Sequence, residues 1–260
     1  MKIATWNVNS IRTRLGHVID WLRVSDVDIL CMQEIKVVDA QFPCAPFEEL
    51  GYNLYLSGQK AYNGVAIASR QPLEDVSCGF TPTLLNIQPD WDEQKRVITG
   101  KIDGIRIVNL YVPNGSAVGS EKYEYKLGWL TVLQEYLRSL LLSQAAICVC
   151  GDFNIALEDK DIHQSAKSEN HIMASEPERQ ALRDILLLGF ADAFRKFTSE
   201  GGHYTWWDYR AASFRRNLGW RIDHHYLTPA LYERAKSCTI DVAPRKLPQP
   251  SDHAPVIVEF

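Results

Sequence analysis

Acidic and amide side chains follow buried, strand-like runs at several distant points of this sequence. Any one of them has an ordinary interpretation, because Asp and Asn favour turns and a lone His before an apolar run is usually structural. Their recurrence at strand ends instead predicts one polar site at a common sheet edge, where clefts form. The residues concerned are Asn7, Glu34, Asp152, Asn154, Asp223, Asp252 and His253.

Several carboxylates at one edge would repel each other unless a cation lies among them. Oxygen ligands suit a hard divalent ion. The six cysteines show no zinc-type spacing, and Cys148 and Cys150 are separated by only one residue. The sequence therefore favours Mg²⁺, with Mn²⁺ as the alternative, over Zn²⁺. We expect the cysteines to be reduced, as small buried side chains of a cytoplasmic protein, while three disulfides are the other arrangement that their number allows.

Aromatic residues and arginines alternate between Gly201 and Arg221. Such a segment suits a surface that stacks on sugars or bases and holds phosphates. The alternative is an aromatic core with solvated arginines, and this is the interpretation we favour for Trp207, which strand alternation turns away from Trp206. The net charge of −4 excludes polyanion binding driven by bulk charge, so nucleic acid would need a local basic rim. Candidates for that rim are Lys122, Arg215, Arg216 and Arg245.

Short apolar runs alternate with amphipathic ones along 260 residues, with no linker or repeat, which predicts a single α/β domain over residues 1–260. Hairpin signals such as Asp103-Gly104 indicate mixed sheets. No phosphate-binding glycine loop or serine-hydrolase elbow occurs, and neither a leader peptide nor a membrane-length apolar run is present. Strands are predicted at 3–8, 28–32, 65–69, 97–102, 105–112, 146–150, 204–208, 222–227 and 255–260, and helices at 11–22, 120–141 and 177–188.

Six short motifs in these positions resemble those of the exonuclease III family of AP endonucleases. They occur in order from the first predicted strand to the last, so the resemblance covers the whole chain. It implies a DNase I-like, four-layer α/β sandwich in which two mixed β-sheets pack between helical layers. The motifs are WNVNSIR (6–12), QEIK (33–36), YVPNG (111–115), GDFN (151–154), WRID (220–223) and SDHAP (251–255).

The resemblance also implies roles for the strand-end residues. Glu34 would be the main metal ligand, with Asp252 and Asn7 completing or supporting the site. Asp152 would act as general base or position the nucleophilic water, and Asn154 would orient the same water. His253, paired with Asp223, would contact a phosphate oxygen, and Tyr111 would support the phosphate or the developing charge.

On the substrate side, the resemblance implies that Trp206, Trp220 and Ile222 line a pocket for an extruded abasic sugar. Arg210 would be inserted into the DNA stack, and Asn114 and Lys126 would contact the DNA backbone.

The implied activity is a Mg²⁺-dependent DNA repair phosphodiesterase that cuts 5′ to abasic sites, with 3′-repair phosphodiesterase or phosphatase and 3′→5′ exonuclease activity. The expected partner is double-stranded DNA with abasic sites or blocked 3′ ends. We expect the protein to act as a monomer and not to associate with a membrane. Two alternatives stay open: another phosphatase or phosphodiesterase of the same superfamily, and a DNA-binding scaffold without catalysis.

Two features depart from the pattern or resist alignment. Asn9 stands where some relatives carry aspartate, which predicts weaker support of the metal site. The stretch 156–175, with Asp159, His163 and His171, is expected to be an exposed loop.

Overall fold

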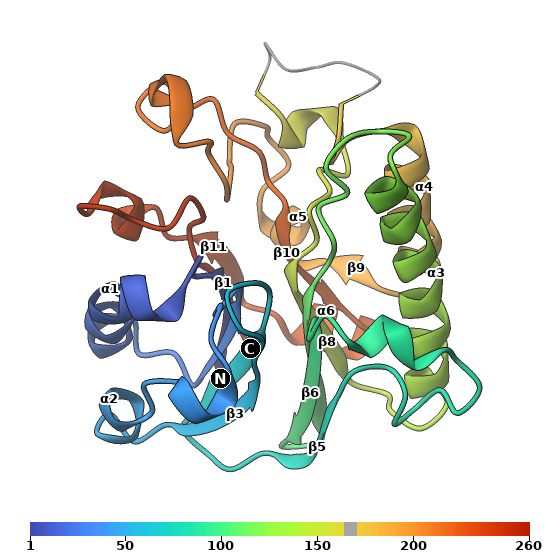
Figure 1. Cartoon of the computed structure of the whole chain (residues 1–260), viewed down its shortest axis with the longest axis horizontal. Coiled ribbons are helices and arrows are strands. Elements are labelled where there is room, and N and C mark those ends of the chain that lie inside the picture. Colours follow the sequence, from blue (N-terminus) through green and yellow to red (C-terminus); the bar gives the residue numbers. More distant parts are fainter. Residues whose placement is uncertain (164–170) are drawn as a thin grey trace.

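Two six-stranded mixed sheets pack face to face in the computed structural model, which describes residues 1–163 and 171–260 (Figure 1). The first sheet has the order β11-β12-β1-β2-β4-β3 and the second β5-β6-β7-β8-β10-β9. The first contains β1 (Lys2–Asn7), β2 (Ile29–Gln33), β3 (Asn53–Ser57), β4 (Val65–Ser69), β11 (Ser237–Ile240) and β12 (Val256–Glu259). The second contains β5 (Glu74–Cys78), β6 (Val97–Ile102), β7 (Ile105–Tyr111), β8 (Ile147–Asp152), β9 (Ala191–Asp192) and β10 (Asp223–Leu227).

Helices cover the outer face of each sheet, which completes the four layers seen in Figure 1. On one side lie α1 (Ile11–Ser25) and α2 (Ala45–Glu48), and on the other α3 (Glu121–Leu141) and α4 (Glu176–Leu186). Two short helices, α5 (Ala193–Phe197) and α6 (Pro229–Arg234), contact β10. Short 3₁₀ turns are η1 (Asp39–Gln41), η2 (Pro89–Asp92), η3 (Asp159–Asp161), η5 (Arg210–Ala212) and η6 (Ala243–Lys246). Among the helices of the described residues, none is long and apolar enough to cross a membrane.

The three largest clusters of the core follow from strand alternation. In β1, Ile3 faces the second sheet, whereas Ala4 and Trp6 face α1. In β8, Cys148 and Cys150 face the first sheet, whereas Ile147 and Val149 pack toward α3. Both central strand pairs, β1 with β2 and β7 with β8, are parallel, and the remaining pairs are antiparallel.

The sequence predicted the central strands and the long helices correctly. The hairpin across Asp103-Gly104 is present, Ser120 caps α3 by accepting a hydrogen bond from the Tyr123 amide, and Pro177 lies in the first turn of α4. The six cysteines are free. The strand predicted at 204–208 is wrong: Trp206 forms only isolated bridges, because this segment crosses the site instead of extending a sheet.

Four strands that the sequence analysis did not predict, β3, β5, β9 and β11, are the outermost strands of the two sheets. β5, for example, is mostly exposed. An edge strand covers less of the core and so lacks the continuous apolar run that revealed the central strands.

Candidate active site

The polar site forms where the central strands of both sheets end. Asn7 closes β1 and Asp152 closes β8, while Asp223 begins β10 directly opposite Asp152. The Asn7 amide nitrogen donates to Glu34 Oε1 at 2.8 Å and to Asp152 Oδ2 at 2.9 Å. One buried side chain of the first sheet therefore holds a carboxylate from each sheet.

The backbone around these side chains adopts unusual conformations. Glu34 and Asn154 have φ of 51° and 49°, in the left-handed region that residues other than glycine rarely occupy. Such strain is typical of functional sites, where surrounding contacts hold it in place. Next to Asp152, Gly151 has φ of 146°, and a Cβ there would lie 1.9 Å from the Leu110 carbonyl oxygen. Only glycine fits at this turn into the site.

His253 lies between two buried aspartates. Its Nδ1 is 2.8 Å from Asp223 Oδ2, and its Nε2 is 3.8 Å from Asp152 Oδ2. Burial by itself would lower the pKa of His253, but the two carboxylates outweigh it and raise the pKa well above the usual range. The imidazole is therefore held as a cation, with its Nε2–H directed into the site.

Asp152 is almost fully buried, and burial raises its pKa above that of an ordinary aspartate, although the neighbouring His253 cation opposes this shift. Asp152 Oδ1 accepts the Asn154 backbone N–H at 2.9 Å. The Asn154 amide oxygen in turn accepts a hydrogen bond from Asn114 Nδ2 at 3.0 Å. A buried carboxylate with a raised pKa, fixed from several sides, has the properties of a general base.

Lys126 does not face this cleft, and its expected contact with the DNA backbone is wrong. The side chain is fully buried and forms an ion pair with Glu178. Its ammonium also donates to the backbone oxygens of Asn154 at 2.8 Å and Asn114 at 3.2 Å. Lys126 therefore positions two residues of the site from behind. The apolar spacing of α3 gave no indication that this lysine would point inward.

Glu34 is partly accessible to solvent. Its Oε2 is 2.7 Å from the ammonium of Lys36, which also donates to Asn9 Oδ1 at 2.6 Å. Burial and the adjacent Glu34 raise the pKa of Tyr111 well above its usual range, so the phenol keeps its proton beside that carboxylate. Lys36 was not among the predicted site residues, although it lies within the same short motif as Glu34.

Asp252 lies on the opposite side of Asn9. Its Oδ1 accepts from Asn9 Nδ2 at 2.9 Å, and its Oδ2 accepts from the Trp206 indole at 2.9 Å. These donors and the adjacent His253 keep the pKa of Asp252 below its usual value despite burial. A chain of contacts through Asn9 and Lys36 thus connects Asp252 to Glu34.

The arrangement can hold a cation. One ligand atom each from Glu34, Asp152 and His253 lies within 4.8 Å of the others. Because His253 is held protonated, the donors on offer are carboxylate oxygens, which suit a hard divalent ion. The Lys36 ammonium beside Glu34 shows that positive charge is stable at this edge. Asp252, predicted as a ligand, is not in that group, and the Asn7 amide nitrogen orients the carboxylates.

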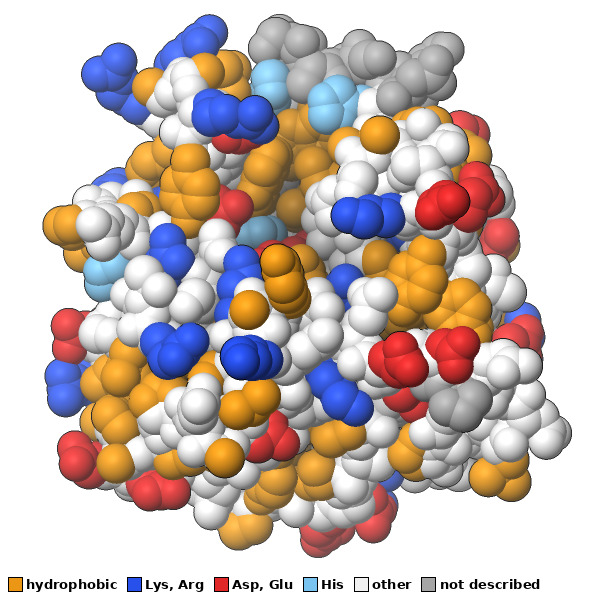
Figure 2. All heavy atoms as spheres, viewed as in Figure 1, with side chains coloured by type: hydrophobic (Ala, Val, Ile, Leu, Met, Phe, Trp, Pro, Cys, Tyr) orange, Lys and Arg blue, Asp and Glu red, His pale blue; other side chains and the backbone are white. Residues whose placement is uncertain are grey.

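A pocket of about 420 Å³ opens beside Trp206, whose indole donates to Asp252. Trp206 and Trp220 line the pocket, as predicted, and so do Arg210 and Asn114, for which contacts with DNA were predicted instead. Ile222 does not line it, because the side chain is buried behind Trp220 among apolar residues. Trp207 is buried, as expected. Figure 2 shows a hollow with hydrophobic side chains within it and with Lys or Arg and His side chains around its rim.

The stretch 156–175 is not simply an exposed loop. Its described residues include buried Asp161, and Ile172 and Met173 line the pocket together with His163 and His171. The His171 ring lies 4.6 Å from that of Trp220. Residues 164–170 of this stretch lie outside the described residues. Two adjacent apolar residues, Ile172 and Met173, were the sequence signal that this segment packs against the molecule.

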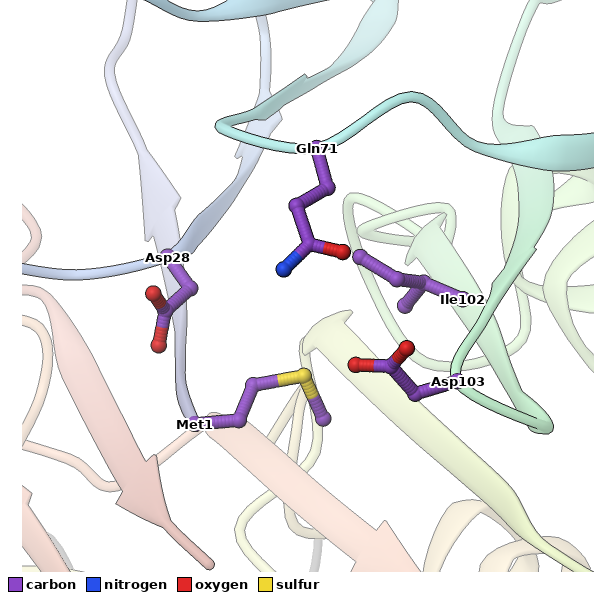
Figure 3. Close-up of a pocket in the computed structure, with 5 residues that line it drawn as sticks. All are labelled: Met1, Asp28, Gln71, Ile102 and Asp103. Carbon is purple, nitrogen blue, oxygen red and sulfur yellow. The ribbon is translucent and has the colours of Figure 1, made fainter.

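Fewer of the candidate basic residues are exposed than the sequence predicted. Arg215, Arg216 and Lys122 are exposed, but Arg245 is buried, with its guanidinium 4.9 Å from the Phe214 ring centre. A second hollow, lined by Met1, Asp28, Gln71, Ile102 and Asp103, lies at the opposite ends of β1 and β7 and carries none of the site residues (Figure 3).

Known proteins resemble this chain over nearly its whole length. The model of the endonuclease/exonuclease/phosphatase family matches residues 4–253. An exodeoxyribonuclease of Bacillus subtilis is 33% identical over 98% of each chain. An AP endonuclease from Archaeoglobus fulgidus superposes with a TM-score of 0.93 at 45% identity, covering 100% of this chain and 99% of its own. A 3′ phosphatase, NExo, from Neisseria, bound to a product DNA hairpin, superposes with a TM-score of 0.94 at 42% identity over the same shares.

The two-sheet sandwich with buried acids and a cationic histidine at one strand edge defines a DNase I-like hydrolase. The chain belongs to the endonuclease/exonuclease/phosphatase family. Its similarity to exodeoxyribonucleases and an AP endonuclease places it among the DNA repair nucleases of the exonuclease III and AP endonuclease type.

Proposed function

We propose that the protein is a Mg²⁺-dependent DNA repair phosphodiesterase that cleaves the backbone 5′ to abasic sites and also removes blocking groups from 3′ ends. The observation that carries this proposal is the placement of Asp152. A buried base with a raised pKa lies between the His253 cation and the accessible Glu34, next to an apolar pocket. Mn²⁺ is the alternative ion.

Each side chain has a role that follows from its contacts. Asp152, with Asn154, would accept the proton of a water and aim it at the phosphorus. His253, kept protonated by Asp223, would donate to a non-bridging phosphate oxygen. Tyr111, which stays protonated, would donate toward the developing charge. When bound by Glu34 and its neighbours, with Asn7 and Asp252 in support, a divalent ion supplies charge neutralisation and relief of the leaving 3′ oxygen.

The substrate follows from the pocket. Its apolar wall, formed by Trp206 and Trp220 over buried Ile222, suits a sugar that carries no base, whereas a base-bearing nucleotide needs more room. Asn114 at the rim and the exposed Arg210, Arg215 and Arg216 would contact the duplex. Arg210 is paired with Asp208 at 2.6 Å, so it would exchange that carboxylate for DNA.

One observation favours a narrower activity on 3′ ends. His171 packs on Trp220, the wall against which the abasic sugar would rest. A 3′-terminal phosphate needs only the phosphate site, not the pocket. The likeness to the Neisseria 3′ phosphatase agrees with this second candidate.

The two candidates separate in one gel assay. Duplexes with a single abasic site or with a 3′-phosphate are incubated with Mg²⁺ and, separately, with EDTA. Cleavage of both in Mg²⁺ alone supports the first proposal, and loss of only the 3′-phosphate supports the second. In the second case His171→Ala should raise abasic cleavage relative to phosphate removal. Both duplexes left intact with every divalent ion would contradict a nuclease.

A further inference from the structure

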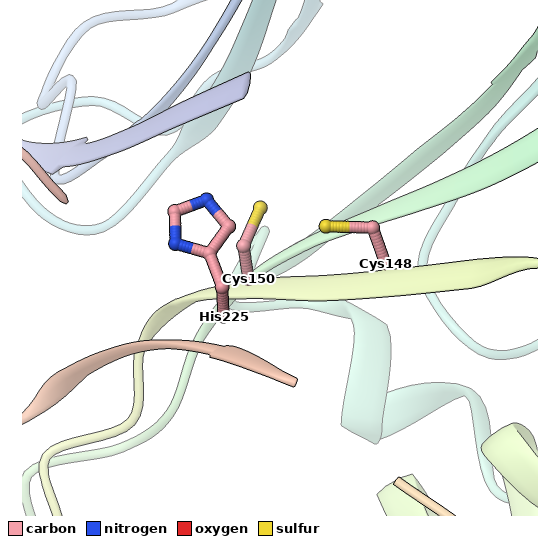
Figure 4. Close-up of side chains that lie close together, drawn as sticks. All are labelled: Cys148, Cys150 and His225. Atoms are coloured by element: carbon pink, nitrogen blue, oxygen red, sulfur yellow. The ribbon is translucent and has the colours of Figure 1, made fainter. Parts of the chain in front are cut away.

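Two thiols and an imidazole gather in the core between the sheets. Cys148 and Cys150 project from β8, and His225 projects from β10 directly opposite Cys150. All three side chains are buried, and one ligand atom of each lies within 4.8 Å of the others. Figure 4 shows the side chains on one side of the sheet, with the Cys148 sulfur directed toward Cys150. We propose that these three residues bind a thiophilic divalent metal ion of the zinc class.

The imidazole gives the first argument. Neither ring nitrogen of His225 has a hydrogen-bond partner. Burial lowers the pKa of His225 to about 3, so the ring is neutral and offers one N–H and one lone pair. The backbone of Ile3 lies near the ring but outside hydrogen-bonding geometry, so the lone pair of the neutral imidazole is free to bind an ion.

Charge balance gives the second argument. Both thiols are fully buried, which favours their neutral form while no ion is bound. Binding would release two protons: two thiols and M²⁺ give a dithiolate complex and 2 H⁺. The total charge of two thiolates, a neutral imidazole and a dication is zero. A neutral complex is the one that a core without water tolerates best. A monovalent copper ion would leave one negative charge uncompensated.

Geometry gives the third argument. Zinc bonds of about 2.3 Å to sulfur and 2.0 Å to nitrogen place ligand atoms roughly 4 Å apart. The three ligand atoms lie within 4.8 Å of one another, so closing on such an ion needs a movement of about 1 Å at most. The Cys31 thiol, on β2 of the other sheet, interacts with that of Cys150 and could close a fourth position. A Cys148–Cys150 disulfide fits less well, because alternate residues of one strand stand about 6.6 Å apart, near the upper limit for such a bond.

The test uses Co²⁺ as the probe, because thiolate-bound cobalt has sulfur-to-cobalt absorption that oxygen ligands cannot produce. The full chain is unfolded, refolded with Co²⁺ in an excess of Mg²⁺, and freed of loose metal on a desalting column. One Co²⁺ per chain should remain, with that absorption, and Zn²⁺ added during refolding should abolish it. The readout does not involve DNA cleavage, so it stands or falls independently of the proposed nuclease activity.

Matched variants assign the signal to the core. The double variant Cys44→Ser and Cys78→Ser removes the two thiols that are not buried and should keep the full absorption. Cys148→Ala should lose it. If Cys148→Ala fails to fold, the surface double variant still decides the case. Loss of the signal in the double variant, or its absence from the wild-type chain, would overturn the proposal.

Discussion

Asp152 and Asp161 are both buried aspartates, yet their pKa values are shifted in opposite directions. Burial raises the pKa of Asp152, and its neighbours are an amide, a histidine and other acids. At Asp161, burial acts in the same direction, but Arg221 outweighs it and lowers the pKa to about 2. Arg221 donates to Asp161 Oδ1 at 2.7 Å and to Asp192 Oδ2 at 2.7 Å.

The difference between the two aspartates lies in the partner. Arg221 keeps its charge at every accessible pH and binds a carboxylate through a rigid fork. It therefore keeps Asp161 ionised down to strongly acidic pH, and this anion holds the pocket segment in place. Asp152 is instead bound by amides beside a histidine and its pKa stays raised, so it remains able to accept a proton. Burial alone therefore does not decide whether an aspartate can act as a base or serves as a stabilising anion.

The sharpest test of this comparison is Asp152→Asn. The amide can still accept from Asn7 but cannot take a proton, so we expect cleavage to fall by about 10³-fold with the fold retained. Rate measurements on an abasic duplex, with circular dichroism as the check on folding, give the result. A wild-type rate would remove Asp152 from the role of base.

Asp161→Asn tests the other half. Loss of this charge leaves the buried Arg221 with fewer partners, so the free energy of unfolding should fall by about 3 kcal/mol. The control is Asp159→Asn in the same segment, whose pair with Arg179 is exposed and should contribute under about 1 kcal/mol. Urea unfolding measures both. Equal losses of unfolding free energy in the two variants would mean that the ion pairs of Asp161 stabilise the fold no more than the exposed pair does.

The two aspartates should also differ in their response to pH. Because the pKa of Asp161 is depressed, its stabilisation is complete above the ordinary aspartate value of about 3.9 and is lost as the pH falls toward 2. Because the pKa of Asp152 is raised, cleavage should already fall at a pH above the usual carboxylate range. Rate and unfolding profiles from one preparation compare the two. A rate that stayed constant down to pH 4 would contradict the raised pKa.

The smallest expected effect concerns Asn9, which lies between Lys36 and Asp252. Asn9→Asp adds a negative charge beside the cation site and should lower the Mg²⁺ concentration for half-maximal rate by roughly fivefold, or about 1 kcal/mol. Gln71→Glu adds the same charge at the opposite end of the strands and serves as the control. Identical metal titrations for Asn9→Asp and the wild type would exclude Asn9 from the site.

How much the sequence could predict depended on burial. Central strands such as β1 and β8 are mostly apolar and buried, so the polar residues at their ends were visible in the sequence alone. Edge strands such as β5 were not, because solvent accepts polar residues there. The inward turn of Lys126 was unpredictable for a related reason: its partner, Glu178, belongs to another helix, and no local pattern indicates a pair across helices.

The amide of Asn7 spans from one sheet to a carboxylate of the other, and this has a consequence for how the enzyme would respond to distant change. The reach of one short side chain sets the spacing of the acids, so a slight widening of the sandwich would separate them while both sheets remain intact. Substitutions in the inter-sheet core, heat or mild denaturant should therefore abolish catalysis before the protein unfolds. The turnover rate would then depend on how closely the two sheets pack, even at positions far from bound DNA.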